Sequence, residues 1–370
     1  MMRGIAFLSV LWLAGCAGLS EESLQMTPAT FGDVPGWREE CPVSALAAFS
    51  ASCAKRPKTS GVADMDAWEA ACSSLPADVD CDGARTFFET RFSVQAMSTG
   101  AGDTGLLTGY YEPSLKGSRV QGPEYSVPLY AVPGDMVSVN LGDFSPDLAG
   151  RKLTGLISGG CLKPYPDRAG IVSGALEKTG QPLVYVDDPA DAFFLQVQGS
   201  GRVALAEGGE LRLGYAGQNG HKYVAIGRTL LDRGDLKPGQ VSMQSIKDWL
   251  RAHPEAADTV MNSNPSYVFF RVLEGDAVGA QNVPLTPLRS LAVDRRHVPL
   301  GLPLFIEAED PVVPGGHIRR LMVAQDTGGA IKGPLRGDFF WGAGPQAEVR
   351  AGTMKSRTRF WMLLPKGRHE

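Results

Sequence analysis

Residues 324–344 read AQDTGGAIKGPLRGDFFWGAG, a glycine-rich stretch that contains two aspartates, Asp326 and Asp338. The pattern predicts a strand that ends at Asp326, a turn at the following glycines, and another strand over 338–341. Carboxyl groups beside glycines and aromatic rings become buried, and burial raises their pKa. Such an acid stays protonated near neutral pH and donates to a leaving oxygen. Asp338 and Asp326 are therefore candidate catalytic residues, although an aspartate before glycine also commonly caps a turn.

A second cluster lies upstream, where residues 107–113 read LTGYYEP and predict a strand. Tyr110 and Tyr111 then project from opposite faces, so that one ring stacks on a sugar while the other packs in the core.

A third cluster is residues 193–201, FFLQVQGSG, which we expect to form part of a strand over 193–206. In a strand, Gln196, Gln198 and Ser200 share one face. Amides and hydroxyls both donate and accept hydrogen bonds, as sugar hydroxyls and N-acetyl groups require. A solvated sheet face has the same composition and is the simpler interpretation of this cluster alone.

The N-terminus predicts export and lipidation. Arg3 precedes a short apolar run over 5–13, which is too short to span a bilayer and is typical of a signal peptide. Residues 13–16, LAGC, resemble a bacterial lipobox, which implies that Cys16 is lipidated. Ala17 after it favours the outer membrane. We expect a signal peptide over 1–15 and a lipidated tether over 16–40.

Four of the remaining cysteines lie between 41 and 81, in a compartment that permits disulfides. A helix over 44–53 would separate Cys41 from Cys53, which leaves two pairings open: 41–81 with 53–72, or 41–72 with 53–81. We favour the nested first pairing. Cys161 is left over, and we expect a buried thiol.

Composition and missing motifs exclude several classes of protein. Lys and Arg number 36 against 40 Asp and Glu, a net charge of −4 that argues against nucleic acid as a partner. The five histidines show no metal-ligand spacing, so we expect no metal. The chain has no nucleophile elbow, Walker A or dinucleotide motif, and we expect no cofactor.

Periodicity predicts a mainly β protein with a few peripheral helices. The expected helices are 44–53, 64–73 with Asp64 as N-cap, 83–91, 222–233 ended by Gly234, and 243–252. The further expected strands are 125–132, 183–187, 211–215, 267–272, 303–307, 320–325 and 358–364. The strands do not alternate regularly with helices, which favours β-barrels over a doubly wound sheet.

Four motifs occur in a fixed order: TGYYEP at 108–113, QVQGSG at 196–201, NPSYVFF at 264–270, and the stretch 324–344. Together they resemble the family of membrane-bound lytic murein transglycosylase A, over about residues 30–365. The resemblance implies a double-psi β-barrel formed by 41–118 and 272–370, with a second β-barrel domain inserted over 119–271. A peptidoglycan strand would lie in the groove between them.

The resemblance also implies roles for individual residues. Asp338 matches the family's single catalytic acid, and Asp326 a supporting residue close to it. Asp294, upstream in LAVDR at 291–295, is a third carboxylate at a strand end, for which we expect a structural or supporting role. The implied substrate-binding residues are Thr108, Tyr110, Tyr111, Gln196, Gln198, Ser200, Tyr267 and Lys332. Implied partners are peptidoglycan glycan strands, the outer membrane through Cys16, and cell-wall synthesis or divisome proteins.

The implied reaction cleaves the β-1,4 bond between N-acetylmuramic acid and N-acetylglucosamine without water. Asp338 serves as acid and then base, and the muramic acid 6-hydroxyl closes a 1,6-anhydro ring. Two alternatives stay open. One is a hydrolase that pairs Asp338 with Asp326 or Asp294. The other is a peptidoglycan-binding lipoprotein without activity.

Overall fold

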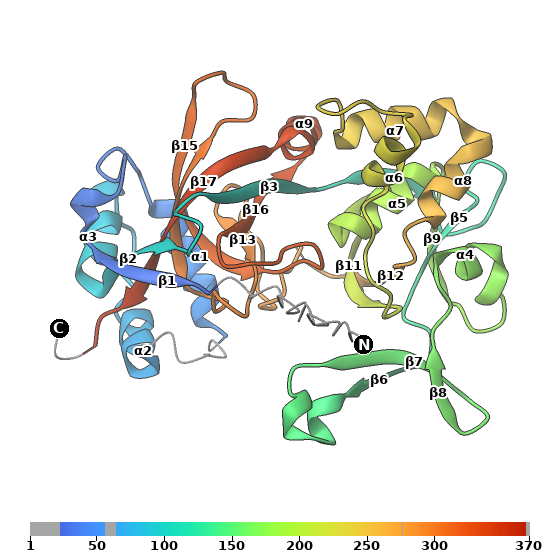
Figure 1. The fold of residues 1–370 in the computed structure, drawn as a ribbon, viewed down its shortest axis with the longest axis horizontal. Coiled ribbons are helices and arrows are strands. Elements are labelled where there is room, and N and C mark those ends of the chain that lie inside the picture. Colours follow the sequence, from blue (N-terminus) through green and yellow to red (C-terminus); the bar gives the residue numbers. More distant parts are fainter. Residues whose placement is uncertain (1–22, 56–63, 276, 368–370) are drawn as a thin grey trace, which may run out of the picture.

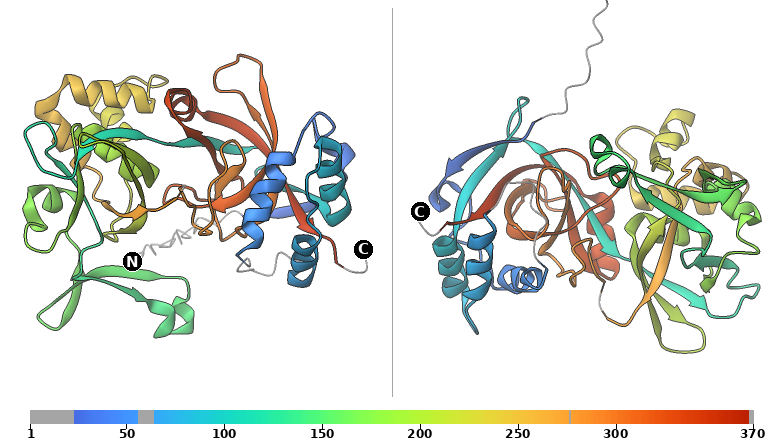
Figure 2. Two further views of the ribbon diagram at one scale, coloured as in Figure 1. Left: turned by 180° about the vertical axis from the view of Figure 1, so that it is seen from behind. Right: turned by 90° about the horizontal axis from the view of Figure 1, so that it is seen from below.

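The structure is a computed structural model that describes residues 23–55, 64–275 and 277–367. Two lobes lie side by side, and the long strand β3 (Gly105–Glu112) leads from one to the other (Figures 1 and 2). The predicted signal peptide and Cys16 lie outside the described residues. Within them, no helix is both long and apolar enough to cross a bilayer.

The first lobe is a closed barrel of six strands. Its strands are paired in the order β17 (Lys355–Pro365), β14 (Pro303–Glu309), β15 (His317–Asp326), β13 (Ser290–Val293), β16 (Arg336–Ala343) and β3. A further pairing between β17 and β3 closes the ring. Strands β2 (Phe92–Ser98) and β1 (Gln25–Ala29) extend the sheet beyond β17.

Three helices cover this barrel: α1 (Val43–Cys53), α2 (Met65–Ser73) and α3 (Cys81–Arg91). All three are predicted from the sequence, and Asp64 caps α2 by accepting from the backbone N–H groups of Asp66 and Ala67. Their aromatic residues, among them Phe49, pack with strand residues such as Phe305 in one apolar core. The nested disulfides are confirmed, since Cys41 pairs with Cys81 and Cys53 with Cys72.

The second lobe contains a sheet of six strands and a smaller one of three. The larger is ordered β12 (Val268–Leu273), β11 (Glu210–Gln218), β10 (Ser200–Leu205), β4 (Ser114–Ser118), β9 (Pro182–Val186) and β5 (Val127–Tyr130). A bridge between Ala131 and Phe270 joins its two ends. The smaller comprises β6 (Met136–Asn140), β7 (Lys152–Ser158) and β8 (Cys161–Pro164), and it projects from the lobe (Figure 1).

Helix α5 (Pro189–Gln198) packs on this second sheet, and three further helices pack with α5 in a separate apolar core. They are α6 (Ile226–Arg233), α7 (Met243–Ala252) and α8 (Pro254–Asn262), with α4 (Arg168–Gly170) and a π-helical turn at Ile171–Ala175 nearby. Helix α9 (Pro345–Thr353) belongs to the first lobe and follows β16 directly. Short 3-10 turns lie at Phe31–Asp33, Leu141–Asp143 and Pro146–Leu148.

The structure corrects the strand predicted over 193–206. Residues 189–198 form α5, and β10 begins only at Ser200. Asp188 caps the helix, Pro189 occupies its first turn, and Gly199 ends it with φ 82°. These start and stop signals outweigh the alternation of amides and apolar residues.

Three further expectations also differ from the structure. Residues 25–29, placed in the tether, pair with β2, and Trp37 is buried in the barrel core. β4 already pairs with β9 and β10, so the chain enters the second lobe at Pro113 rather than after residue 118. Cys161 is exposed rather than buried, because it lies in the projecting sheet.

Candidate active site

The two candidate carboxylates lie on the same face of the barrel. Ala292 on β13 registers with Asp326 on one side and with Asp338 on the other. Two strand spacings therefore separate the aspartates, about 9.5 Å between their α-carbons. Asp338 registers in turn with Thr108 on β3. Alternate residues such as Phe339 point into the barrel core, so this row faces away from that core.

A directed chain of hydrogen bonds holds Asp338. Arg336 Nη2 donates to Thr108 Oγ1 over 2.8 Å, and Thr108 Oγ1 donates to Asp338 Oδ1 over 2.5 Å. A guanidinium only donates, so the threonine hydroxyl accepts from Arg336 and must direct its own hydrogen to Asp338. With Oδ1 thus occupied, Oδ2 is the oxygen left to carry an acidic proton.

Both carboxylates have raised pKa values. Burial is the main cause and raises the pKa of Asp338 to about 6, against the hydrogen bond from Thr108 and the charge of Arg336. The Asp326 carboxylate raises it further. Burial likewise raises the pKa of Asp326 to about 6. Both side chains remain partly exposed, as groups that meet a substrate must be.

Asp326 is held by backbone donors. The N–H groups of Ala280 and Thr327 donate to its Oδ1 over 2.9 and 2.8 Å. The neighbouring Gln325 is fully buried and donates to Ser52 on α1 over 2.9 Å. Ser52 in turn donates to Gln281, next to Ala280, over 2.9 Å. Side-chain amides therefore fasten both segments that surround Asp326 to the disulfide-bonded helix α1.

Tyr110 lies close to both aspartates. Its hydroxyl is buried and makes no hydrogen bond of good geometry within the described part of the chain. Burial, and then the charges of Asp326 and Asp338, raise the pKa of Tyr110 well above its ordinary value, so it stays a neutral donor. Its ring packs 5.0 Å from that of Phe340. Of the two adjacent tyrosines, Tyr110 therefore faces the carboxylates.

Asp294 has a different environment. It accepts hydrogen bonds from Arg296 and from the N–H of Gly333, the latter over 2.9 Å. Burial opposes the charge of Asp294, but these hydrogen bonds prevail and hold its pKa well below the usual range. The carboxylate thus fastens the loop that leads to β16. Lys332 is exposed on that same loop.

The expected row of amides on a strand does not form, because Gln196 and Gln198 lie in α5. Gln196 is buried and accepts from Arg168 over 2.6 Å. Gln198 accepts from the backbone N–H of Tyr111 over 3.1 Å and so joins α5 to β3. Ser200 is the first residue of β10.

Tyr267 is buried, and Arg168 lies 5.2 Å from the centre of its ring. Arg168 also donates to the carbonyls of Asn264 and Ser266, so it organises the NPSY segment. Burial raises the pKa of Tyr267. Arg168 therefore holds Gln196 and Tyr267 together below the surface rather than in a solvated row.

Three groups that shape the site were not predicted from the sequence: Arg336, Arg168 and the backbone donor of Ala280. Arg336 lies two residues before Asp338 in the stretch 324–344, and side chains two residues apart in a strand lie on the same face. The contacts of Arg168 and Ala280 join distant segments, and no local pattern indicates them. Among the described residues, no group of three His, Cys, Asp or Glu side chains could hold a metal ion.

Comparisons with known proteins agree with this geometry. Residues 106–271 match the family model described as "MltA specific insert domain", and residues 289–364 match the "3D domain". The membrane-bound lytic murein transglycosylase A of Vibrio cholerae is 34% identical over 74% of this chain and 70% of its own length.

Solved structures are also similar. MltA from Neisseria gonorrhoeae gives a TM-score of 0.81 at 36% identity and covers 93% of both chains. The membrane-bound lytic murein transglycosylase from Agrobacterium tumefaciens gives 0.83 at 34% identity, over 92% of this chain and 97% of the other. E. coli MltA with bound chitohexaose gives a TM-score of 0.67 at 29% identity, over 95% of this chain and 96% of the other.

The mainly β fold with a double-psi barrel is thereby confirmed. Sequence identity extends along both lobes, and the closed barrel carries its aspartates within the region matched by the 3D domain. The chain belongs to the membrane-bound lytic murein transglycosylase A family, whose members are peptidoglycan-cleaving enzymes.

Proposed function

We propose that this enzyme cleaves the β-1,4 bond between N-acetylmuramic acid and N-acetylglucosamine, with Asp338 as its only acid and base. The observation that carries the proposal is the state of Asp338: a carboxyl of pKa about 6, with Oδ1 fixed by Thr108. Near neutral pH such a group exists in both protonation states, as a residue that donates and then accepts a proton requires.

The reaction then balances without water. Asp338 Oδ2 gives its proton to the glycosidic oxygen while the bond from that oxygen to C1 breaks, through an oxocarbenium-like transition state. The carboxylate next accepts the proton of the muramic acid 6-hydroxyl, whose oxygen bonds to C1. The product is a 1,6-anhydro sugar, and Asp338 ends protonated. A nucleophile within the substrate has a high effective concentration, so a second carboxylate is unnecessary.

Asp326 supports this chemistry from across Ala292. Its charge raises the pKa of Asp338, and its own Oδ1 is occupied by two backbone donors. Asp294 is unsuited to acid–base catalysis. Its pKa is held low, and its carboxylate already accepts hydrogen bonds from Arg296 and from the N–H of Gly333.

A glycan substrate is supported by the E. coli relative with bound chitohexaose, a β-1,4-linked N-acetylglucosamine chain. Tyr110 lies beside both aspartates, but its hydroxyl is buried and its ring packs on Phe340, so we assign it a role in supporting the carboxylates rather than in contacting the glycan. Thr108 and Lys332 remain candidate substrate contacts. Tyr111 is buried with its hydroxyl near Lys247, and Gln196, Ser200 and Tyr267 support the second lobe from within.

We also propose attachment to the periplasmic face of the outer membrane through lipidated Cys16. The LAGC sequence at 13–16 supports it, and the relatives are named membrane-bound. Replacing Cys16 by alanine should leave the protein folded but release it from membranes in high salt. A variant still sedimenting with membranes would contradict the lipid anchor.

Digestion of purified murein, with mass spectrometry of the released fragments, tests the reaction. Lytic cleavage gives anhydro-muropeptides, each lighter by one water than the hydrolytic product. Reducing ends would instead indicate a two-carboxylate hydrolase, and no release would indicate a binding protein. Asp338→Asn serves as the control that should release nothing above background.

A further inference from the structure

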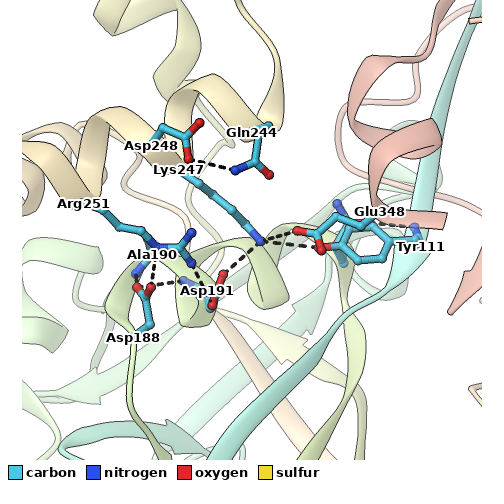
Figure 3. Close-up of polar contacts among 10 residues, drawn as sticks. Tyr111, Asp188, Ala190, Asp191, Gln244, Lys247, Asp248, Arg251 and Glu348 are labelled. Carbon is cyan, nitrogen blue, oxygen red and sulfur yellow. Dashed lines mark hydrogen bonds and ion pairs between the residues drawn. The ribbon is translucent and has the colours of Figure 1, made fainter. Parts of the chain in front are cut away.

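Lys247 on α7 reaches across the contact between the two lobes. Only 5% of the residue is exposed. Its ammonium donates to Asp191 on α5 over 2.9 Å and to Glu348 on α9 over 2.8 Å (Figure 3). The Tyr111 hydroxyl on β3 lies 3.5 Å away. One buried cation therefore joins a carboxylate of its own lobe to two residues of the barrel lobe.

Arg251, one turn further along α7, makes the matching contacts within the second lobe. It donates to Asp188 over 2.7 Å and to Asp191 over 3.0 Å (Figure 3). Asp191, Lys247 and Arg251 line a pocket of about 200 Å³ together with Tyr111 and Glu348. Within this cluster, the ion pair of Lys247 with Glu348 connects the lobes, and those of Arg251 do not.

The ion pair of Lys247 is well suited to a rigid link. Burial opposes the charge, but hydrogen bonds to Glu348 and Asp191 outweigh it and raise the pKa of the Lys247 ammonium. The ammonium is nearly buried, whereas the side chains of Asp191 and Glu348 are 27% and 32% exposed, so salt screens these contacts less than it screens a fully exposed pair. The geometry is therefore enforced more strongly than in an exposed surface pair.

Both barrel-side partners of Lys247 lie on elements next to the row formed by Thr108, Asp338 and Asp326. Tyr111 lies on β3 three residues after Thr108 and points to the opposite face of the strand. Glu348 lies on α9, which follows β16 and therefore Asp338. The link therefore ends on β3, which carries Thr108, and on α9, the helix that follows the strand of Asp338.

We propose that Lys247 is a positioning residue that clamps the second lobe against the barrel and so sets where that lobe holds the glycan relative to Asp338. Among the described residues, its ammonium contacts Asp191, Glu348 and Tyr111 rather than Asp326 or Asp338. The part of this inference that concerns turnover rests on the proposed function, whereas the part that concerns lobe orientation does not.

Glu348→Gln tests the clamp, because it removes one charge and keeps the shape. Arg251→Gln is the matched control, since it removes a charge from the same cluster without affecting a contact between lobes. Spin labels go on exposed positions of each lobe, Glu255→Cys and Val313→Cys, in full-length protein in which Cys16 and Cys161 are replaced. Double electron–electron resonance then reports the distance distribution between the lobes.

We expect a broader or shifted distribution for Glu348→Gln and an unchanged one for Arg251→Gln. Murein turnover by Glu348→Gln should lose about 2- to 30-fold in kcat/KM, mainly through KM, as for other residues that couple distant sites. Should this variant unfold, Glu348→Asp keeps the charge on a shorter side chain and should give a smaller change of the same kind.

Equal distributions and equal KM values for Glu348→Gln and the parent protein would overturn the clamp. The same change in Arg251→Gln would also overturn it. The effect would then arise from any loss of charge around Arg251 and Lys247, and not from the ion pair of Lys247 with Glu348. A parent protein that leaves murein intact would instead refute the proposed reaction, and the distance measurement would still decide whether Lys247 clamps the lobes.

Discussion

Thr108 donates its hydroxyl hydrogen to Asp338 across the pairing of β3 with β16, although 230 residues separate them in sequence. The contact joins a strand from the N-terminal part of the barrel to one from its C-terminal part. Arg336 fixes the direction of the bond, because it occupies the acceptor side of the hydroxyl. The Asp338 carboxylate is thus oriented only when both parts of the barrel have assembled.

Thr108→Val removes this donor and keeps the shape of the side chain. The hydrogen bond from Thr108 lowers the pKa of Asp338, so its loss should raise that pKa above about 6. In its proposed role as the acid, Asp338 acts when protonated, so turnover should fall as pH rises through its pKa. The alkaline limb of the profile of kcat/KM against pH should therefore move to higher pH.

Maximal turnover should fall as well, because Asp338 is oriented less well. Thr229→Val is the control, since it loses a comparable hydrogen bond, to Ser263, in the second lobe. An alkaline limb that stays in place in Thr108→Val would mean that this contact does not set the acidity of Asp338.

Asp338→Asn should abolish nearly all turnover while fold and glycan affinity persist. General acid–base catalysis alone contributes about 10²–10⁴-fold, and here one group serves both steps. Asp326→Asn should be milder, because its amide still accepts from Ala280 and Thr327. Murein turnover with thermal melts of both variants gives the ranking. If Asp326→Asn is the less active variant, the acid is Asp326.

Local signals account for what could be predicted from the sequence. Asp64 before an apolar stripe predicts α2, and the spacing of Cys53 and Cys72 allows their pairing. The glycine-rich turn between two aspartates similarly indicates the site. Short segments such as 193–198 fit two periodicities, and there the flanking Asp188 and Gly199 decide for a helix.

The features of the site that could not be predicted from the sequence depend on contacts between distant segments. Arg168 gathers Gln196 on α5 with the carbonyls of Asn264 and Ser266, and only the assembled second lobe brings these groups together. The pKa of Asp338 is likewise a property of the enclosed site, since burial is its largest cause.

Gln196→Ala should destabilise the protein rather than weaken glycan binding directly. Its Oε1 accepts from Arg168 over 2.6 Å in the interior, and removing it leaves a buried charged donor unsatisfied. Such losses cost about 1–3 kcal/mol. Gln198→Ala is the control, because Gln198 is less buried and loses only a bond from a backbone N–H. Urea unfolding of both measures the difference, and equal midpoints would contradict a structural role for Gln196.

Gly109→Ala should disturb the site although Gly109 bears no functional group. A β-carbon there would lie 2.7 Å from Trp341 Nε1 and 2.8 Å from the α-carbon of Ala351 on α9. The backbone of α9 must therefore move away from β3, next to Thr108. We expect a loss of about 1–3 kcal/mol in stability and slower murein turnover. Gly122→Ala, in open space, should change neither the melting temperature nor the rate.

Asp294→Asn should destabilise the protein at neutral pH, and the effect should vanish in acid. The pKa of Asp294 is depressed in the folded protein, so its carboxylate contributes stability above the unfolded pKa of about 3.9. That contribution is lost as pH falls through the folded value. Protonated aspartate resembles asparagine, and the two proteins should therefore converge at low pH. Denaturant unfolding at a series of pH values measures this, and a difference that is constant with pH would show that the charge of Asp294 does not hold the loop at Gly333.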